Sequence, residues 1–143
     1  KPTIGYCTNV HAGVDLESIC KNLEQYAVPA RAATGSLELG VGLWLPAQAA
    51  AELSADVSDF AKFLRDRRLR PFTINAFPYD NFHEPIVKRR VYQPAWWQPE
   101  RLEYTRQLAE ILAKLLGTPP ALLAVIFGLT RRHTQRPRLR SLA

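Results

Sequence analysis

The sequence predicts an α/β fold built on a parallel sheet. Two kinds of segment alternate along its 143 residues: short runs rich in β-formers or continuously apolar, and longer amphipathic runs with helical spacing. This alternation is typical of parallel strands joined by helical crossovers. Hydrophobic residues make up 47% of the chain, and no run of about 18 apolar residues predicts a membrane span. We therefore expect a folded, cytoplasmic protein.

The first strand and helix are predicted near the start of the chain. Thr3–Val10 is short and rich in β-formers, and a turn follows at residues 11–13. Asp15 is suited to cap a helix. The apolar positions of that helix follow the i, i+3, i+4, i+7 spacing: Leu16, Ile19, Cys20, Leu23 and Ala27.

The second unit begins with a strand at Leu37–Leu45, which is almost continuously apolar and therefore predicted to be covered on both faces. Pro46 suits a first helical turn, and an alanine-rich segment follows it. Ser54 or Asp56 is expected to cap a further helix. Its buried stripe is predicted to be Val57, Phe60, Ala61 and Leu64.

The third strand is predicted at Phe72–Phe77, because Arg70 and Pro71 are expected to break the preceding helix. Pro99 opens a third helix, and Gly117 with two following prolines ends it. The predicted apolar face of this helix consists of Leu102, Thr105, Leu108, Ala109, Leu112, Leu115 and Leu116. A fourth strand is expected at Ala121–Leu129.

The order of these elements, about four parallel strands with three crossover helices, predicts a partial (β/α)8 TIM barrel. A complete barrel needs about 250 residues, so residues 1–130 are expected to be its N-terminal half. Neither GxGxxG nor GxxxxGK[ST] occurs, which disfavours dinucleotide-binding and phosphate-loop folds. Half a barrel has open sheet edges, so we expect a homo-oligomer, a fragment of a larger product, or poor solubility. A self-contained α/β sandwich is the alternative.

The basic charge of the chain is confined to its end. The net charge is +6, but five arginines lie after residue 130, and residues 1–130 carry only 14 − 13 = +1. Residues 131–143 are therefore expected to be a basic, disordered or frame-shifted tail. A phosphate-binding tail and a merely solvated end are the alternatives. We expect no nucleic-acid partner for the body of the chain, and we expect Cys7 and Cys20 to be free buried thiols.

Polar residues follow each of the first three predicted strands. Working groups in parallel barrels lie at the C-terminal ends of the strands, so these side chains are expected to converge on a small-molecule site. The candidate ligand-binding residues are Asn9, His11, Trp44, Asn75, Tyr79 and His83.

Two of these residues, together with one neighbouring acid, are also candidate metal ligands. His11 and His83 carry imidazoles, the commonest metal-binding side chains, and Glu84 is the acid beside His83. A hydrogen-bonded, loop-anchoring role is the alternative for each histidine. Likewise, the aromatic residues near the site form either an apolar wall or ordinary packing, with Trp96 and Trp97 packing the long loop. The basic cluster Lys88–Arg90 is either an anion contact or a solvated face.

Five stretches together resemble one family: IGYCTNVHAG (4–13), LELGVGLWLP (37–46), PFTINAFPYDNFH (71–83), VKRRVYQPAW (87–96) and RLEYTRQLAEILAKLL (101–116). They are similar to the N-terminal half of the EboE-type metabolite-traffic proteins, of the xylose-isomerase-like TIM-barrel superfamily. Beyond Gly117 the resemblance ends.

This resemblance implies a protein that binds or transports a small metabolite. The alternative that it implies is a divalent-metal-dependent sugar isomerase or epimerase, using Mn²⁺, Mg²⁺ or Zn²⁺, with further carboxylates from later strands. Whether the chain catalyses a reaction stays open at this point, and no other cofactor is expected.

Overall fold

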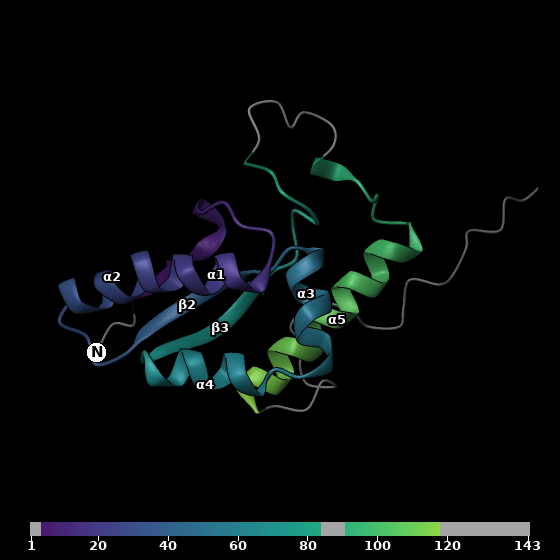
Figure 1. Ribbon diagram of the computed structural model, residues 1–143. Helices are drawn as coiled ribbons and strands as arrows, with labels where there is room; N and C mark the ends of the chain where they lie inside the picture. The colour runs from purple at the N-terminus through teal and green to yellow at the C-terminus, as the bar shows by residue number, and fades with distance from the viewer. Residues whose placement is uncertain (1–3, 84–90, 118–143) are drawn as a thin grey trace, which may run out of the picture.

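Three parallel strands form the sheet of the protein in a computed structural model that describes residues 4–83 and 91–117 (Figure 1). They lie in the order β1-β2-β3, which is also their order in the sequence. Their bounds are β1 (Gly5–Cys7), β2 (Leu39–Trp44) and β3 (Leu69–Asn75). The predicted α/β class is confirmed. The fourth strand expected at 121–129 and the tail expected at 131–143 lie outside the described residues.

Helices connect the strands. Between β1 and β2, α1 (Leu16–Asn22) continues through a π-helical turn into α2 (Val28–Ala33). Between β2 and β3 lie α3 (Ala47–Ala55) and α4 (Ser58–Asp66), and α5 (Pro99–Leu116) follows β3. The predicted cap at Asp15 is confirmed, because its carboxylate accepts a hydrogen bond from the Ser18 amide at 2.7 Å. The prediction for the next cap is wrong: Val57 caps α4, Ser54 lies inside α3, and the Asp56 carboxylate accepts from the Ser58 amide at 2.8 Å.

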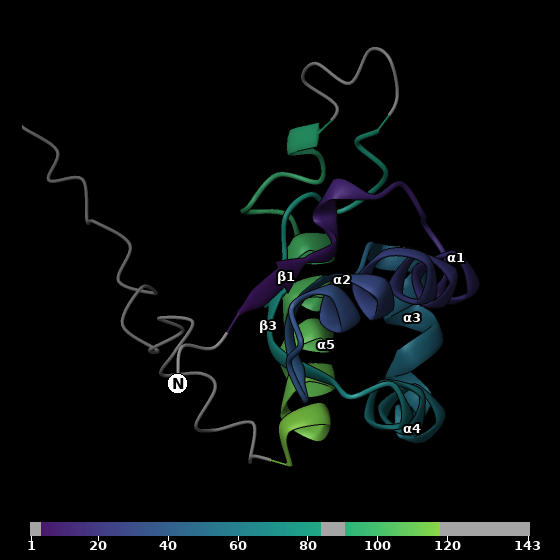
Figure 2. The ribbon, with the colours of Figure 1, turned by 90° about the vertical axis from the view of Figure 1, so that its left-hand side faces the viewer.

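All of these helices lie on one side of the sheet (Figure 2). The buried residues of β2 that face them alternate with glycines on the other face, as the two-residue period of a strand requires. Within the described part of the chain, no helix covers that second face. The core therefore lies between the sheet and the helices. Its members include Leu23, Leu39, Val41, Leu43, Leu45, Leu53, Phe60, Leu64, Tyr104, Leu108, Ile111 and Leu112.

The bounds of all three described strands differ from those predicted, and β2 is shorter at both ends than the expected 37–45. β1 stops at Cys7, because residues Thr8–Val10 turn into a short 3₁₀ helix. β3 begins at Leu69, so Pro71 lies inside the strand instead of ending a helix. Among the described strands β3 is an edge strand, where proline is tolerated, and the pairing register shifts directly after Pro71.

The buried face of α5 agrees with the prediction only in part: Leu108 and Leu112 are buried as expected, but the first turn differs. Leu102 is 64% exposed, whereas Arg101 and Tyr104 are 1% and 2% exposed. The Arg101 guanidinium donates hydrogen bonds to the carbonyl oxygens of Pro94 (3.0 Å) and Ala76 (3.2 Å). These carbonyl oxygens and the surrounding aromatic rings stabilise the guanidinium. The first turn of the helix therefore buries an arginine where a leucine was expected.

Candidate functional site

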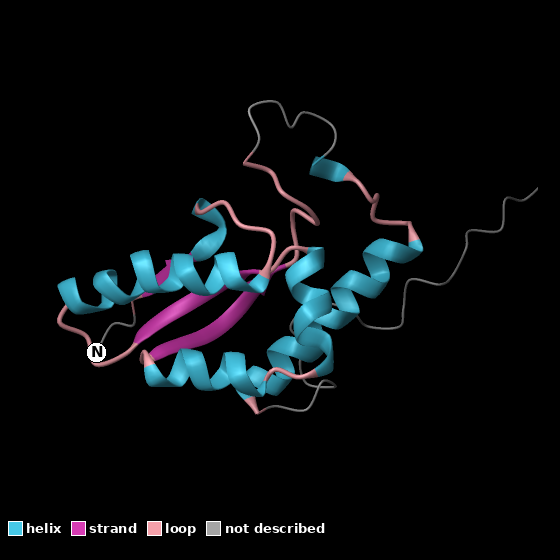
Figure 3. Cartoon of the chain, in the orientation of Figure 1, coloured by secondary structure: helices cyan, strands magenta, loops and turns pink. Residues whose placement is uncertain are grey.

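A pocket of about 410 Å³ lies at the carboxyl ends of the three strands. The loops after β1 and β3 run beside each other at this end of the sheet (Figure 3). The lining residues come from all three strands and the segments after them: Cys7, Asn9, Gly42, Leu43, Thr73, Ile74, Asn75 and Ala76. The pocket therefore combines a thiol, a hydroxyl and two carboxamides with apolar surface, and none of these described residues is charged.

Gly42, in the middle strand, lets the neighbouring strands approach each other across the pocket floor. A Cβ atom at this position would lie 3.2 Å from Cγ2 of Thr73 and 3.4 Å from Sγ of Cys7. These distances leave little space for a side chain at position 42. The absence of one brings the Cys7 thiol and Thr73 together over β2.

His83 joins the loop after β3 to the turn after β1. Its Nε2 atom lies 3.1 Å from the backbone oxygen of Asn9, and its amide donates to Oδ1 of Asn81 at 3.0 Å. The ring lies 5.5 Å from the Trp44 ring and 4.1 Å from the Phe82 ring, centroid to centroid. With Nε2 donating to Asn9, Nδ1 of the neutral ring is the unprotonated nitrogen, and it is buried without a hydrogen-bond partner among the described residues.

His11 is held by two tyrosines. The Tyr6 hydroxyl lies 2.5 Å from Nε2 of His11, and the imidazole stacks on the Tyr26 ring at 4.0 Å. Burial lowers the pKa of His11, and the nearby His83 lowers it further. The lowered pKa favours the neutral imidazole, whose Nε2 can accept a hydrogen bond from the Tyr6 hydroxyl, and this contact anchors the turn after β1.

Trp44 lies beneath the loops and not on the wall of the pocket. It is 2% exposed, its indole N–H donates to the Pro78 carbonyl at 3.0 Å, and its backbone amide donates to Oγ1 of Thr8 at 2.8 Å. The Phe82 ring meets it edge-on at 4.9 Å. Trp44 therefore holds together the segments that follow the first and third strands.

Tyr79 faces the core. Its ring meets that of Tyr104 edge-on at 4.8 Å, and the Tyr104 hydroxyl donates to the Leu45 carbonyl at 2.7 Å. Burial raises the pKa of Tyr104, so its hydroxyl stays protonated and remains a donor. Tyr79 and Tyr104 therefore pack in or against the core and do not line the pocket.

The structure divides the six predicted ligand-binding residues into two groups. Asn9 and Asn75 line the pocket, and His83 is bonded to the backbone of Asn9. His11, Trp44 and Tyr79 hold the surrounding segments in place. Among the residues that the sequence did not point to, Cys7 and Thr73 line the pocket; Thr73 precedes Asn75 by two positions, and this spacing on a strand places both on one face.

Two of the three predicted metal ligands, His11 and His83, lie among the described residues. In the described ranges, no three His, Cys, Asp or Glu side chains lie close enough together to hold one. The Nε2 atoms of His11 and His83 already engage Tyr6 and Asn9. Glu84, the third predicted ligand, and the basic cluster Lys88–Arg90 lie outside the described residues.

Two further predictions about loop and thiol packing are wrong. Trp97 is 87% exposed and Trp96 is 63% exposed, the latter with its ring 4.9 Å from the Arg101 guanidinium. Cys7 is exposed in the pocket, and only Cys20 is half-buried, with its pKa raised by burial. The other alternative, an aromatic wall, is not formed by these tryptophans at the described pocket, because neither lines it.

The fold and pocket define an α/β protein with a polar site at the carboxyl edge of a parallel sheet. Comparison of the chain with protein-family models, with curated proteins and with solved structures gave no match. None of the helices in the described ranges has the length and apolar character needed to cross a membrane.

Proposed function

We propose that the protein binds a small uncharged organic metabolite in the pocket at the carboxyl ends of its strands, without converting it. The observation that carries this proposal is the convergence of Asn9, Thr73 and Asn75 from two separate strand ends on one pocket. Concave sites with mostly apolar walls and a few converging polar groups are the usual form of small-molecule sites.

The lining residues favour an uncharged ligand. A carboxamide offers both donors and acceptors, and a hydroxyl does the same, so the three side chains suit hydroxyl, carbonyl or amide groups. Leu43 and Ile74 supply apolar contact beside them. A phosphate or carboxylate ligand would favour arginine or lysine in the lining, and the described lining contains neither.

We further propose that the three strands belong to a (β/α) barrel of the xylose-isomerase-like kind. The resemblance to the EboE-type metabolite-traffic proteins supports this, and so does the sequential order β1-β2-β3 with helices on one face only. Doubly wound sheets have helices on both faces, whereas successive units of a barrel have them on the outside. The open face of the sheet then corresponds to the inside of the barrel.

The alternative, a metal-dependent sugar isomerase or epimerase, needs inward carboxylates that hold a metal and move a proton beside a carbonyl group. No carboxylate lies in the described lining. The proposal therefore commits to binding alone, with His83 and Trp44 as residues that position the pocket.

Ligand-observed NMR with the full chain tests the proposal. A small-molecule cell extract is separated by ion exchange into uncharged and charged fractions, and each is scanned for saturation transfer from the protein. We expect signals from the uncharged fraction that are lost in Asn75→Ala and Thr73→Val but kept in Gln48→Ala, a matched change on the exposed face of α3. Binding from the charged fraction alone, or binding that survives both pocket variants, would overturn it.

A further inference from the structure

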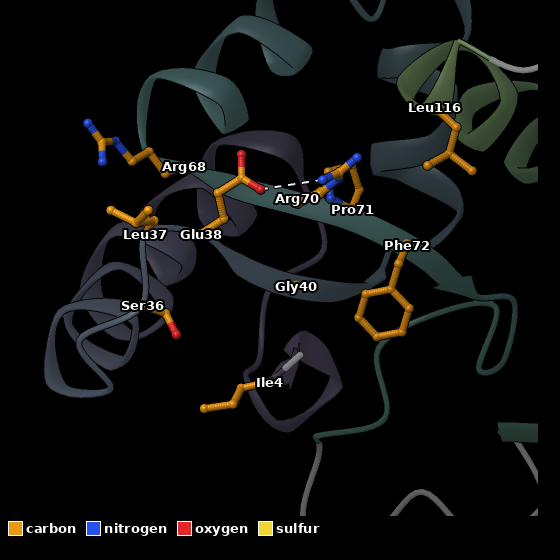
Figure 4. Close-up of a pocket in the computed structure, with 10 residues that line it drawn as sticks. All are labelled: Ile4, Ser36, Leu37, Glu38, Gly40, Arg68, Arg70, Pro71, Phe72 and Leu116. Atoms are coloured by element: carbon orange, nitrogen blue, oxygen red, sulfur yellow. Dashed lines mark hydrogen bonds and ion pairs between the residues drawn. The ribbon is translucent and has the colours of Figure 1, made fainter. Parts of the chain in front are cut away.

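A second hollow lies at the opposite, amino ends of the same strands. It has a volume of about 850 Å³ and is lined by residues just before each strand and by the first residues of β2 and β3 (Figure 4). Its apolar members are Ile4, Leu37, Pro71, Phe72 and Leu116. We call this hollow the amino-end groove.

Phe72 forms the apolar floor of the amino-end groove. It is the extra residue at the register shift between β2 and β3, and its ring lies against the open face of the sheet. Cβ atoms built at Gly5 and Gly40 would each lie 3.3 Å from this ring, so the two glycines leave the room that it occupies. The ring is nonetheless 52% exposed, and Leu37 beside the groove is 74% exposed.

The side chains that line the amino-end groove carry a net positive charge. Arg68 and Arg70 line it against a single acid, Glu38. Arg70, in β3, and Glu38, directly before β2, point toward each other with 3.4 Å between Nη1 and Oε2, and their side chains are 77% and 58% exposed (Figure 4). Such an exposed ion pair contributes little free energy, so an incoming anion competes with Glu38 for the guanidinium at low cost.

The second arginine is held at the rim by the backbone. Arg68 has φ = 56°, which non-glycine residues rarely adopt, and its carbonyl accepts a hydrogen bond from the Leu39 amide at 3.1 Å. In the described part of the chain the Arg68 side chain makes no ion pair. The rim therefore keeps one positive charge in excess after Glu38 is counted.

We propose that the amino-end groove binds a small amphiphilic monoanion, with its carboxylate on Arg70 and its aromatic or short aliphatic body against Phe72. A guanidinium binds a carboxylate with two parallel hydrogen bonds, and the exposed ring removes apolar ligand surface from water. Arg68 adds long-range attraction at the rim. Because this groove lies at the other ends of the strands from the pocket, binding in the groove does not depend on ligand binding in the pocket.

Matched probes test the proposal in the full chain. We titrate 4-phenylbutyrate, 4-phenylbutylamine and 4-phenylbutanol, which share one apolar body, by isothermal calorimetry. We expect the acid to bind more tightly than the alcohol and the amine not to bind. Arg70→Gln weakens binding of the acid about tenfold, Phe72→Ala weakens all binding, and Lys62→Gln on the exposed surface of α4 changes nothing.

Glu38→Gln gives the sharpest outcome: it removes the competitor for Arg70, so the acid is expected to bind severalfold more tightly. Equal binding of acid and amine, no effect of Arg70→Gln, or weaker binding in Glu38→Gln would overturn the proposal. Sedimentation equilibrium tests whether a second copy of the chain, and not a small anion, fills the groove. Self-association that Phe72→Ala abolishes would show a second copy there and would overturn the proposal. Unchanged circular dichroism in each variant confirms that the fold is intact.

Discussion

Nε2 of His83 is hydrogen-bonded to the backbone oxygen of Asn9, a residue 74 positions earlier in the chain. This contact ties the segment after β3 to the turn after β1, across the end of β2. The Trp44 ring packs beside the imidazole, with 5.5 Å between the ring centroids. The candidate pocket thus owes its shape to contacts between strand ends that are far apart in sequence.

His83→Ala is expected to destabilise the protein by about 1–3 kcal/mol, because it leaves the Asn9 carbonyl without its partner and removes ring contacts with Trp44 and Phe82. Urea unfolding followed by Trp fluorescence measures this loss. Gln48→Ala, on the exposed face of α3, is the control and is expected to change stability by less than about 0.5 kcal/mol. A His83 variant as stable as the control would show that the contact does not hold the loops.

Arg101→Met is expected to cost about 2–4 kcal/mol, because two partly buried carbonyl oxygens, those of Pro94 and Ala76, lose a charged donor. Arg106 lies on the same helix but pairs with Glu103 and Glu110 on the exposed surface. Arg106→Met is therefore expected to cost no more than about 1 kcal/mol. Chemical denaturation of the two variants side by side compares them, and equal losses would contradict the structural role of Arg101.

The lowered pKa of His11 predicts a pH-dependent stability. The unfolded chain takes up a proton near the ordinary pKa of 6.5, whereas the folded chain takes it up only at lower pH. The folded state is therefore favoured above that pKa, and its stability falls as the pH drops from 6.5 through the folded value. The groups that face His11 are Tyr6, Tyr26 and His83.

Urea unfolding of the protein and of His11→Asn at pH 7.5 and pH 5.5 tests this prediction. We expect the loss of stability between the two pH values to be smaller in the variant, which has no imidazole at this position to protonate. An identical loss in both proteins would assign the pH dependence to other groups.

The order of the elements follows from local patterns in the sequence, and most of it could be predicted. The apolar run at 37–45, the cap at Asp15 and the glycine at 117 each depend on neighbouring residues, and the structure places strands, helices and caps there. The prediction that Pro71 breaks the preceding helix is wrong, because Pro71 lies inside β3. Proline disrupts a helix, but an edge strand tolerates it. Such an exception depends on the sheet and not on the local sequence.

The location of the site at the ends of the strands could be predicted from the sequence, but the arrangement of its side chains could not. Asn9 and Asn75 follow strands and do line the pocket, as parallel strands require. That Trp44 and Tyr79 turn toward the interior depends on the Pro78 carbonyl and on Tyr104, which are distant in sequence. The burial of Arg101 depends in the same way on carbonyls that only the folded chain brings to it.

The two thiols are expected to react at very different rates. Cys7 is exposed in the pocket, whereas Cys20 is half-buried and burial raises the pKa of its thiol, which lowers the fraction of reactive thiolate. Mass spectrometry after brief treatment with iodoacetamide is expected to find carbamidomethyl groups on Cys7 first. Faster modification of Cys20 would contradict the packing of Cys20 against the hydrophobic core.

The central claim is that the pocket beside Cys7, Asn9 and Asn75 binds a metabolite, and protection of Cys7 tests it most directly. In the Cys20→Ala variant, the rate of Cys7 alkylation is measured with and without the uncharged small-molecule fraction of a cell extract. We predict slower alkylation with that fraction, and loss of this protection when Asn75→Ala is added. An alkylation rate that no fraction changes, or protection that persists in the Asn75 variant, would contradict the account.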